Sequence, residues 1–264
     1  MKLSDILAVL EGLAPLRYAE PWDNVGLLVG DPAAEVRRIL VTVDYTAAVA
    51  EEAVATRAEL VLAYHPPMFA AVKRVPHDAL WADAIRRGIA LYSPHTALDV
   101  ARNGTNDFLA DACGIVAGDA RRPLRPFVGR DIDEPASIGL GRVGPIVSAP
   151  LEGVVRKLKS ALGLEALMLA GDPARSVTRV AVAAGAGGEL LEVAIRAGAE
   201  LFVTGEIRHH DALAALRRGT AVIATLHSNS ERAAVRAHAA AIDAALDGVV
   251  VATSDADADP FVFV

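Results

Sequence analysis

Histidine and carboxylate residues recur at one spacing in two separate stretches of the sequence. His227 and Glu231 lie four residues apart behind a short apolar run, and His95 and Asp99 repeat this arrangement earlier in the chain. Residues four apart on a helix share one face, so each pair can offer a nitrogen and an oxygen to one cation. Imidazole and carboxylate ligands together favour Zn, Fe, Mn or Co over Mg or Ca. The two pairs therefore predict divalent metal binding.

A third histidine, His65, also follows an apolar run and is followed by Pro66 and Pro67. Two prolines end a strand and hold the backbone extended, so they restrict the position of His65. A lone histidine is more often a core residue than a ligand. The position of His65 at a strand end, like that of the two pairs, favours the ligand interpretation.

A further cluster of ionisable residues follows the apolar run 201–203, and it contains Glu206, His209 and His210. So many ionisable groups directly behind a strand are unusual for a simple turn. We expect this segment to form the opposite wall of the cleft that holds the metal.

Short helices and strands must position these residues. Apolar spacing and turn residues predict an alternation of the two. The helices are predicted over 4–13, 46–58, 78–87 and 151–162, and the strands over 38–44, 60–63, 89–92, 201–203 and 221–224.

The alternation occurs twice, with similar residues in each copy. Residues 38–43 resemble 179–184, and residues 58–61 resemble 199–202. Chance similarity between alanine-rich segments is the alternative, but the shared order of elements favours an internal duplication. The predicted fold is α/β, with two related α/β domains and the metal site in the cleft between them. We place the halves at 1–125 and 126–264, with the chain crossing between them near both termini.

Composition limits the classes of partner. The 264 residues carry a formal charge of -7, which argues against nucleic acid because phosphate binding needs a basic surface. An anionic, nucleotide-like small ligand held by a metal stays compatible with this charge. A lone cysteine, Cys113, and the lack of an 18-residue apolar run predict a cytoplasmic protein without a membrane partner.

Two glycine-rich segments resemble phosphate-binding loops. Residues 139–144, Gly-Leu-Gly-Arg-Val-Gly, match the dinucleotide fingerprint in letters, but Pro145 follows and no strand–turn–helix unit surrounds them. Residues 185–188 lie between a predicted strand and helix, where their amides could face an anion. A tight turn explains residues 185–188 equally well.

Several motifs follow one another along nearly the whole chain: Trp22–Leu27, Tyr64–Pro67, Pro94–Asp99, Gly139–Gly144, Thr204–His210 and His227–Glu231. In this order they resemble the Nif-three-like family, whose bacterial members are labelled GTP cyclohydrolase 1 type 2 homologues. The resemblance implies two α/β domains, a dinuclear metal centre and a toroidal homohexamer. The connection 114–150 is too short for the domain that many members insert there.

The resemblance also implies roles for individual residues. His65 and Asp99 are expected to bind one metal ion, His227 the other, and Glu231 both. The cofactors would then be two divalent ions per chain. The family's bacterial pattern often has two histidines before the proline, whereas this chain has Tyr64 in the first place. A phenol is a poor ligand at its ordinary pKa, so Tyr64 is a doubtful ligand and we expect unequal occupancy of the two sites.

These features support a metal-dependent hydrolase, of GTP cyclohydrolase type if the family label applies, with His95 or His209 transferring protons. The alternative is a non-catalytic metal-binding hexamer that serves as a scaffold or partner platform. A third interpretation is a nucleotide-binding regulator that uses residues 185–188.

Overall fold

The computed structural model describes residues 1–127 and 137–262, and these form two compact units. The first unit contains Met1–Leu98 and Val235–Pro260, and the second contains the described residues of Asp99–Ala234 together with Phe261 and Val262. The predicted boundary between residues 125 and 126 falls inside the second unit. Within the described residues, no helix combines the length and apolar character needed to cross a bilayer.

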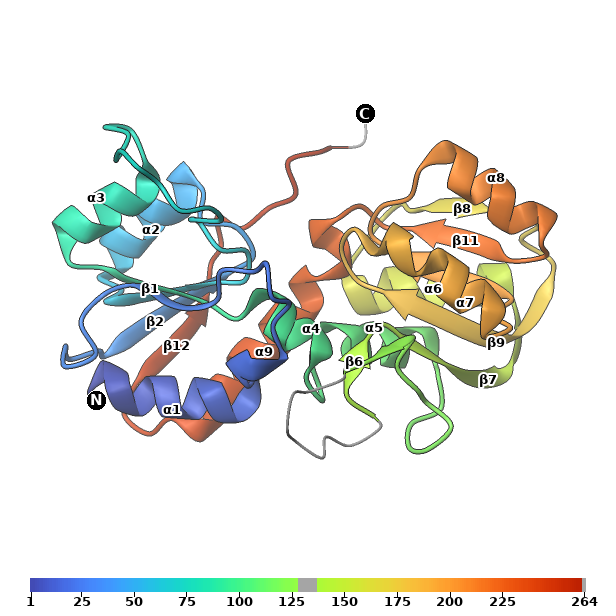
Figure 1. Ribbon diagram of the computed structural model, residues 1–264, viewed down its shortest axis with the longest axis horizontal. Coiled ribbons are helices and arrows are strands. Elements are labelled where there is room, and N and C mark those ends of the chain that lie inside the picture. Colours follow the sequence, from blue (N-terminus) through green and yellow to red (C-terminus); the bar gives the residue numbers. More distant parts are fainter. Residues whose placement is uncertain (128–136, 263–264) are drawn as a thin grey trace. The chain divides into compact units, whose positions relative to one another are not determined.

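The first unit is built on a five-stranded mixed sheet (Figure 1). Its strands, in spatial order, are β1 (Gly26–Val29), β4 (Ala90–Ser93), β3 (Leu60–Ala63), β2 (Arg38–Thr42) and β12 (Val250–Thr253). All neighbours pair in parallel except β1, which lies antiparallel to β4 at the edge. The carboxyl ends of β2, β3 and β4 therefore lie at one edge of this sheet, where α/β proteins commonly bind ligands.

Helices cover both faces of the first sheet (Figure 1). Buried side chains of α2 (Ala47–Thr56) and α3 (Leu80–Arg87) pack with alternate residues of the strands, such as Val61 and Ala63. The opposite face carries α1 (Leu3–Leu13). The observed helices agree with those predicted over 4–13, 46–58 and 78–87, because their apolar spacing and ends are local signals.

The second unit has its own five-stranded mixed sheet. Its strands, in spatial order, are β7 (Arg142–Pro150), β9 (Ser176–Ala183), β10 (Leu201–Thr204), β11 (Ala221–Ala224) and β8 (Met168–Ala170). The three central strands are parallel, and both edge strands run antiparallel to their neighbours.

Alternate residues of the central strands enter two separate cores. Val180 and Val182 pack with α5 (Thr105–Cys113) and α6 (Leu151–Leu162) on one face. Ala181 lies in the core beneath α7 (Leu191–Arg196) and α8 (His209–Arg217) on the other. The packing of α5 in the second unit explains why the division differs from the predicted halves, since α5 precedes residue 125.

The same order of elements occurs in both units. In each, a helix and a short strand precede three parallel strands, and that short strand becomes the antiparallel edge next to the third. A matched hydrogen bond accompanies this order. Glu59 accepts from the backbone N–H of Arg38 at 2.8 Å, and Glu200 accepts from that of Arg179 at 3.2 Å. The units differ in their fifth strand, which is the parallel β12 in one and the antiparallel β7 in the other.

The predicted connection 114–150 is described only in part, because residues 128–136 lie outside the described residues. It contains β5 (Arg125–Pro126), β6 (Gly139–Leu140) and β7. The fold is thus a mixed α/β protein with two five-stranded mixed sheets in the described chain.

Candidate metal centre

In the first unit, His65 stands at the carboxyl end of β3, two residues beyond Ala63. Its backbone N–H donates to the carbonyl oxygen of Val43 at 3.0 Å, which extends the pairing of the parallel strands past their ends. Its ring Nδ1 lies 2.9 Å from Oδ1 of Asp44, which follows β2. The neighbouring strand therefore both places His65 and orients its ring.

His95 follows β4 and begins the short helix α4 (His95–Val100). Its Nδ1 lies 2.8 Å from Oδ1 of Asp23, a carboxylate with no exposed side-chain surface. The other oxygen of Asp23 accepts from the backbone N–H of Thr96 at 3.1 Å and also from its hydroxyl. Burial alone would raise the pKa of Asp23, but the bonds to His95 and Thr96 outweigh burial and lower it.

The two histidines of the first unit lie close together. The ring centroids of His65 and His95 are 5.4 Å apart, and the ring of Tyr64 lies 5.0 Å from the first and 5.6 Å from the second. Tyr64 is 1% exposed. The structure thus brings the three predicted residues of this unit together, with the phenol in a buried position beside both imidazoles.

In the second unit, His227 and Glu231 follow β11. Nε2 of His227 lies 3.5 Å from Oε1 of Glu231, and Nδ1 lies 3.0 Å from Oε1 of Glu206, which follows β10. Glu231 is 2% exposed. The predicted pair is therefore adjacent in space, and Glu206 lies on the other side of the imidazole.

The local geometry of this pair differs from the predicted helix face. A 3-10 turn, η3 (Ser228–Ser230), separates the two residues, and α9 (Arg232–Ala245) begins only after Glu231. The Ser230 hydroxyl donates to the carbonyl oxygen of His227 at 2.6 Å. The pair stands ahead of the helix because this hydrogen bond favours a tight turn there.

The backbone of Gly185 packs directly against this pair, where no side chain would fit. A Cβ atom at Gly185 would lie 2.5 Å from Oε1 of Glu231 and 3.3 Å from Nε2 of His227, and the backbone φ there is +61°. At Gly187, a Cβ would lie 2.8 Å from Oγ1 of Thr204. Close packing thus explains Gly185 beside His227 and Glu231, and Gly187 beside Thr204.

The histidines share one hydrogen-bonding pattern. Nδ1 of His65, His95 and His227 each contacts a carboxylate. Histidines that bind metals through Nε2 usually donate Nδ1–H to a carboxylate or carbonyl, which fixes the tautomer and the ring orientation. This pattern fits a divalent metal of the class that takes nitrogen and oxygen ligands.

Asp99 belongs to the second unit and lies within α4. One carboxylate oxygen accepts a short hydrogen bond from the Thr105 hydroxyl, and the Asp99 carbonyl accepts from the Asn106 side chain at 3.0 Å. These bonds fix the residue, and its role as a ligand stays a prediction.

His209 begins α8, where its ring lies 5.3 Å from that of His210. Both histidines are exposed. A cavity of about 500 Å³ near the start of this helix is lined by Glu206 and by Ala186, Gly188, Glu189, Ile207, Arg208 and Asp211. The role of His209 in proton transfer stays a prediction, and Glu206 connects this cavity to the His227 ring.

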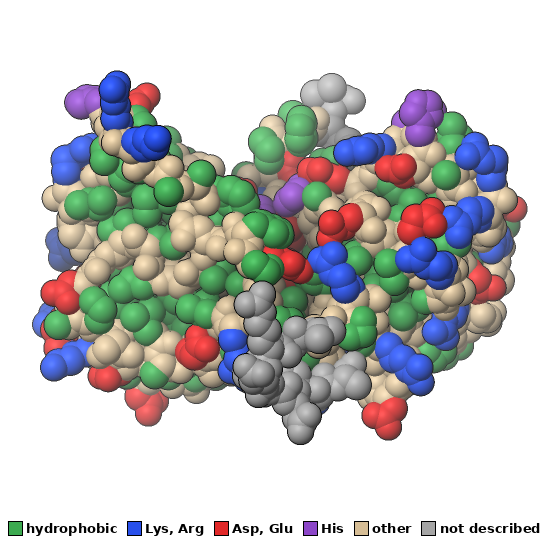
Figure 2. Space-filling view, in the orientation of Figure 1, with side chains coloured by type: hydrophobic (Ala, Val, Ile, Leu, Met, Phe, Trp, Pro, Cys, Tyr) green, Lys and Arg blue, Asp and Glu red, His purple; other side chains and the backbone are tan. Residues whose placement is uncertain are grey.

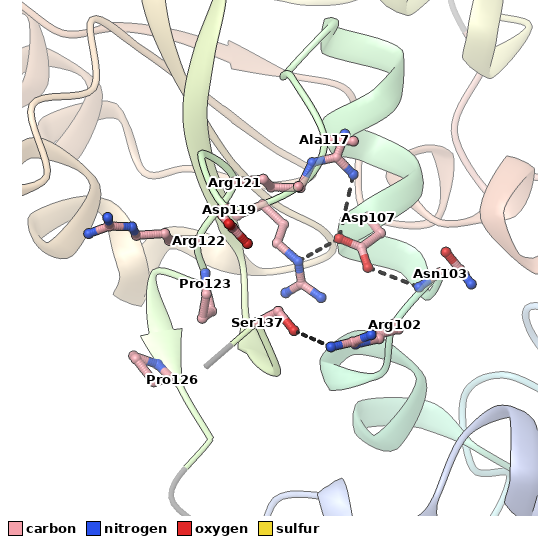
Figure 3. A pocket seen from close by; sticks show the side chains of 12 residues that line it. Arg102, Asn103, Asp107, Ala117, Asp119, Arg121, Arg122, Pro123, Pro126 and Ser137 are labelled. Atoms are coloured by element: carbon pink, nitrogen blue, oxygen red, sulfur yellow. Dashed lines mark hydrogen bonds and ion pairs between the residues drawn. The ribbon is translucent and has the colours of Figure 1, made fainter. Parts of the chain in front are cut away.

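The fingerprint-like segment 139–144 has a structural role. Arg142 is 1% exposed and donates to Asp107 at 2.6 Å and to the carbonyl oxygens of Gly139 and Gly141 at 2.5 and 2.8 Å. Figure 3 shows the adjacent cavity of about 750 Å³, in which Arg121 also reaches Asp107. These hydrogen bonds of Arg142 stabilise the turn that residues 139–142 form.

The surface of the second unit carries both signs of charge. Figure 2 shows Lys and Arg side chains interspersed with Asp and Glu over its drawn face. This distribution accompanies the formal charge of -7.

Sequence reasoning missed two orienting residues of this site. Asp23 and Asp44 were not among the predicted site residues, although Asp23 lies in the Trp22–Leu27 motif and Asp44 ends a predicted strand. Their positions at loop and strand ends were the signal that could have indicated them.

Comparison with known proteins identifies relatives along the whole chain. The family model described as Duf34/NIF3 (NGG1p interacting factor 3) matches residues 1–260. NIF3-like protein 1 of Drosophila melanogaster is 35% identical over 273 residues, covering 100% of this chain and 89% of the relative. A GTP cyclohydrolase 1 type 2 homolog of Clostridium perfringens is 33% identical over 237 residues, covering 88% and 87%. The crystal structure of a hypothetical protein from Staphylococcus aureus superposes with a TM-score of 0.88 at 25% identity, covering 100% and 99%. The resemblance expected from the motifs is confirmed, and the chain belongs to the Duf34/NIF3 family.

Proposed function

We propose that this protein is a metal-dependent hydrolase whose metal-binding group contains His65, His227 and Glu231. The observation that carries the proposal is the arrangement of His227 between two carboxylates, with Glu206 at Nδ1 and Glu231 at Nε2. The backbone of Gly185 packs against that pair, and Asp44 orients His65 in the corresponding way.

Asp99 would complete a dinuclear centre in this proposal, with Glu231 shared by both ions. The buried phenol of Tyr64 stands where a second histidine would add a ligand, so the second ion is held less tightly. The same proposal includes the homohexamer that the family resemblance implies.

In this proposal, carboxylates orient the histidines and one histidine transfers a proton. When bound, a divalent metal polarises a substrate oxygen and increases the acidity of water near neutral pH. Asp44 and Glu206 fix the orientation of His65 and His227. Asp23 holds His95 through Nδ1, so that Nε2 can exchange a proton with the substrate. The name of the Clostridium relative supports a GTP-like substrate.

The test compares His227→Ala with His77→Ala, since His77 is an exposed histidine of the first unit. Both proteins are loaded with Zn, Mn, Fe or Co, dialysed and analysed for metal. Turnover of GTP and of a panel of phosphoesters is then measured. We expect His227→Ala to lose bound metal and at least about 100-fold in activity, whereas His77→Ala keeps both.

The second candidate function is a non-catalytic metal-binding hexamer that acts as a partner platform. The family description, which names an interacting factor, supports it. Full metal occupancy with no turnover of any compound in the panel would overturn the hydrolase proposal. Equal turnover rates for His227→Ala and His77→Ala would overturn it as well. A metal-dependent change in oligomeric mass would then favour the platform.

A further inference from the structure

Two large aromatic side chains lie exposed and adjacent on the first unit. Trp22 is 59% exposed and Phe69 is 54% exposed. Their ring centroids are 5.8 Å apart, with the planes tilted by 44°. Aromatic residues make up only 5% of the chain. An exposed aromatic pair leaves a large apolar area in water, so it indicates a surface that another molecule covers.

This pair adjoins the candidate site. The Trp22 ring approaches the His95 ring edge-on, with centroids 6.3 Å apart and an interplanar angle of 75°. The His95 ring in turn lies 5.4 Å from that of His65. A molecule resting on Trp22 would therefore have its edge within reach of the imidazoles that the proposed function uses.

Hydrogen bonds fix the loop that carries Trp22. The next residue, Asp23, binds His95 and Thr96, and Asn24 donates from its side chain to the carbonyl oxygen of Met68 at 2.5 Å. That last bond ties the Trp22 loop to the segment carrying Phe69. The two segments that carry the rings are thus connected before a ligand arrives, which reduces the entropy lost on binding.

We propose that Trp22 and Phe69 form an aromatic platform that binds the planar heteroaromatic ring of the substrate by stacking. The proposal rests on the proposed function, because it concerns the substrate of the same site. Stacking on an aromatic face requires a flat, unsaturated ring and tolerates different bases. The platform therefore selects the class of ring, while polar contacts select among its members.

The chain offers a direct reporter, since it contains only two tryptophans, Trp22 and Trp81. The variant Trp81→Phe leaves Trp22 as the sole indole and replaces a half-buried ring by another aromatic ring. Its fluorescence is titrated with guanosine monophosphate and, separately, with ribose 5-phosphate, in metal-stripped protein. We expect saturable quenching by the nucleotide only.

The further substitution Phe69→Ala should weaken binding of guanosine monophosphate by about tenfold or more. Val75→Ala is the matched control, since Val75 is also a large exposed apolar residue and is 62% exposed. We expect Val75→Ala to leave the affinity unchanged, and light scattering to give the same mass for both variants.

The outcomes separate this proposal from the proposed function. Equal quenching by both probes, or none, overturns the platform, as does a lower mass for Phe69→Ala, which would place the pair between copies of the chain. Ring binding that survives in a protein with no hydrolytic activity supports the platform and counts only against the hydrolase. Hydrolysis without ring binding supports the hydrolase and counts only against the platform.

Discussion

Each histidine of the candidate site is oriented by a carboxylate from another segment. Asp23 belongs to the loop before β1, Asp44 follows β2, and Glu206 follows β10. The backbone is strained at one of these histidines and beside another. The dihedral φ is +28° at His95 and +72° at Leu226, the residue before His227. Such conformations of residues other than glycine cost about 1–3 kcal/mol each. The fold tolerates that cost at the two points where an imidazole must be aimed.

Replacing Gly185 by alanine tests whether the close approach of this backbone to His227 and Glu231 is needed. The added Cβ would overlap Glu231 Oε1, at 2.5 Å, so we expect a loss of stability of about 1–3 kcal/mol. Metal affinity should also fall by at least about tenfold. Urea unfolding in a chelator and metal analysis after dialysis measure the two effects.

The matched control is Gly188→Ala, because a Cβ there would meet only the carbonyl oxygen of Glu206, at 4.0 Å. This variant should keep its metal. Equal metal content and equal stability in the two variants would contradict the assigned role of Gly185.

The helix α9 contains both the division between the two units and a buried histidine. The division into units falls within α9, since Ala234 belongs to the second unit and Val235 to the first. On the part of α9 in the first unit, His238 is 7% exposed, and burial lowers its pKa to about 4. A buried neutral imidazole of this kind links the stability of the helix to pH.

The effect of pH follows from the sign of that shift. Because the folded protein holds the pKa of His238 below its ordinary value of 6.5, the unfolded chain binds the proton first as the pH falls. The contribution of His238 to the free energy of unfolding is therefore fully present above pH 6.5. It is lost between pH 6.5 and 4, at about 1.4 kcal/mol per pH unit.

Replacing His238 by leucine should remove this slope. Urea unfolding of both proteins at pH 7.5, 6 and 5, with a chelator present, gives the free energy of unfolding at each pH. We expect the wild-type value to fall more steeply than that of the variant. Parallel decreases would show that His238 does not titrate in this range.

At the scale of the whole molecule, two units share one order of elements but are not formed from continuous halves. Residues 235–260 return to the first unit and supply its fifth strand, β12. A metal that binds only the folded chain, as the proposed function requires, would add to the stability of the protein.

Removal of the metal should lower the melting temperature. At a free metal concentration about 100 times Kd, the stabilisation is about 2.7 kcal/mol, and it disappears on chelation. His65→Ala should abolish the difference between loaded and chelated protein, whereas His77→Ala should retain it. Differential scanning calorimetry measures each pair, and an unchanged difference in His65→Ala would exclude His65 as a ligand.

The sequence by itself determined the local elements and the positions of the reactive residues along them. The strands over 60–63 and 221–224 and the helix over 151–162 were predicted with their observed bounds, because apolar spacing and chain-breaking residues act over a few positions. The motifs likewise identified the family, and the histidines at strand ends were predicted from the residues that precede them.

Only the tertiary structure decided which distant residues meet. Asp23 and His95 are 72 positions apart, and nothing in the local pattern assigns that carboxylate to that ring. The same holds for Gly185, whose missing side chain matters because Glu231 and His227 pack against it. The division into units also depended on where α5 and β12 pack. Contacts of this kind arise from the packing of whole sheets and helices, which the local periodicity of a sequence does not encode.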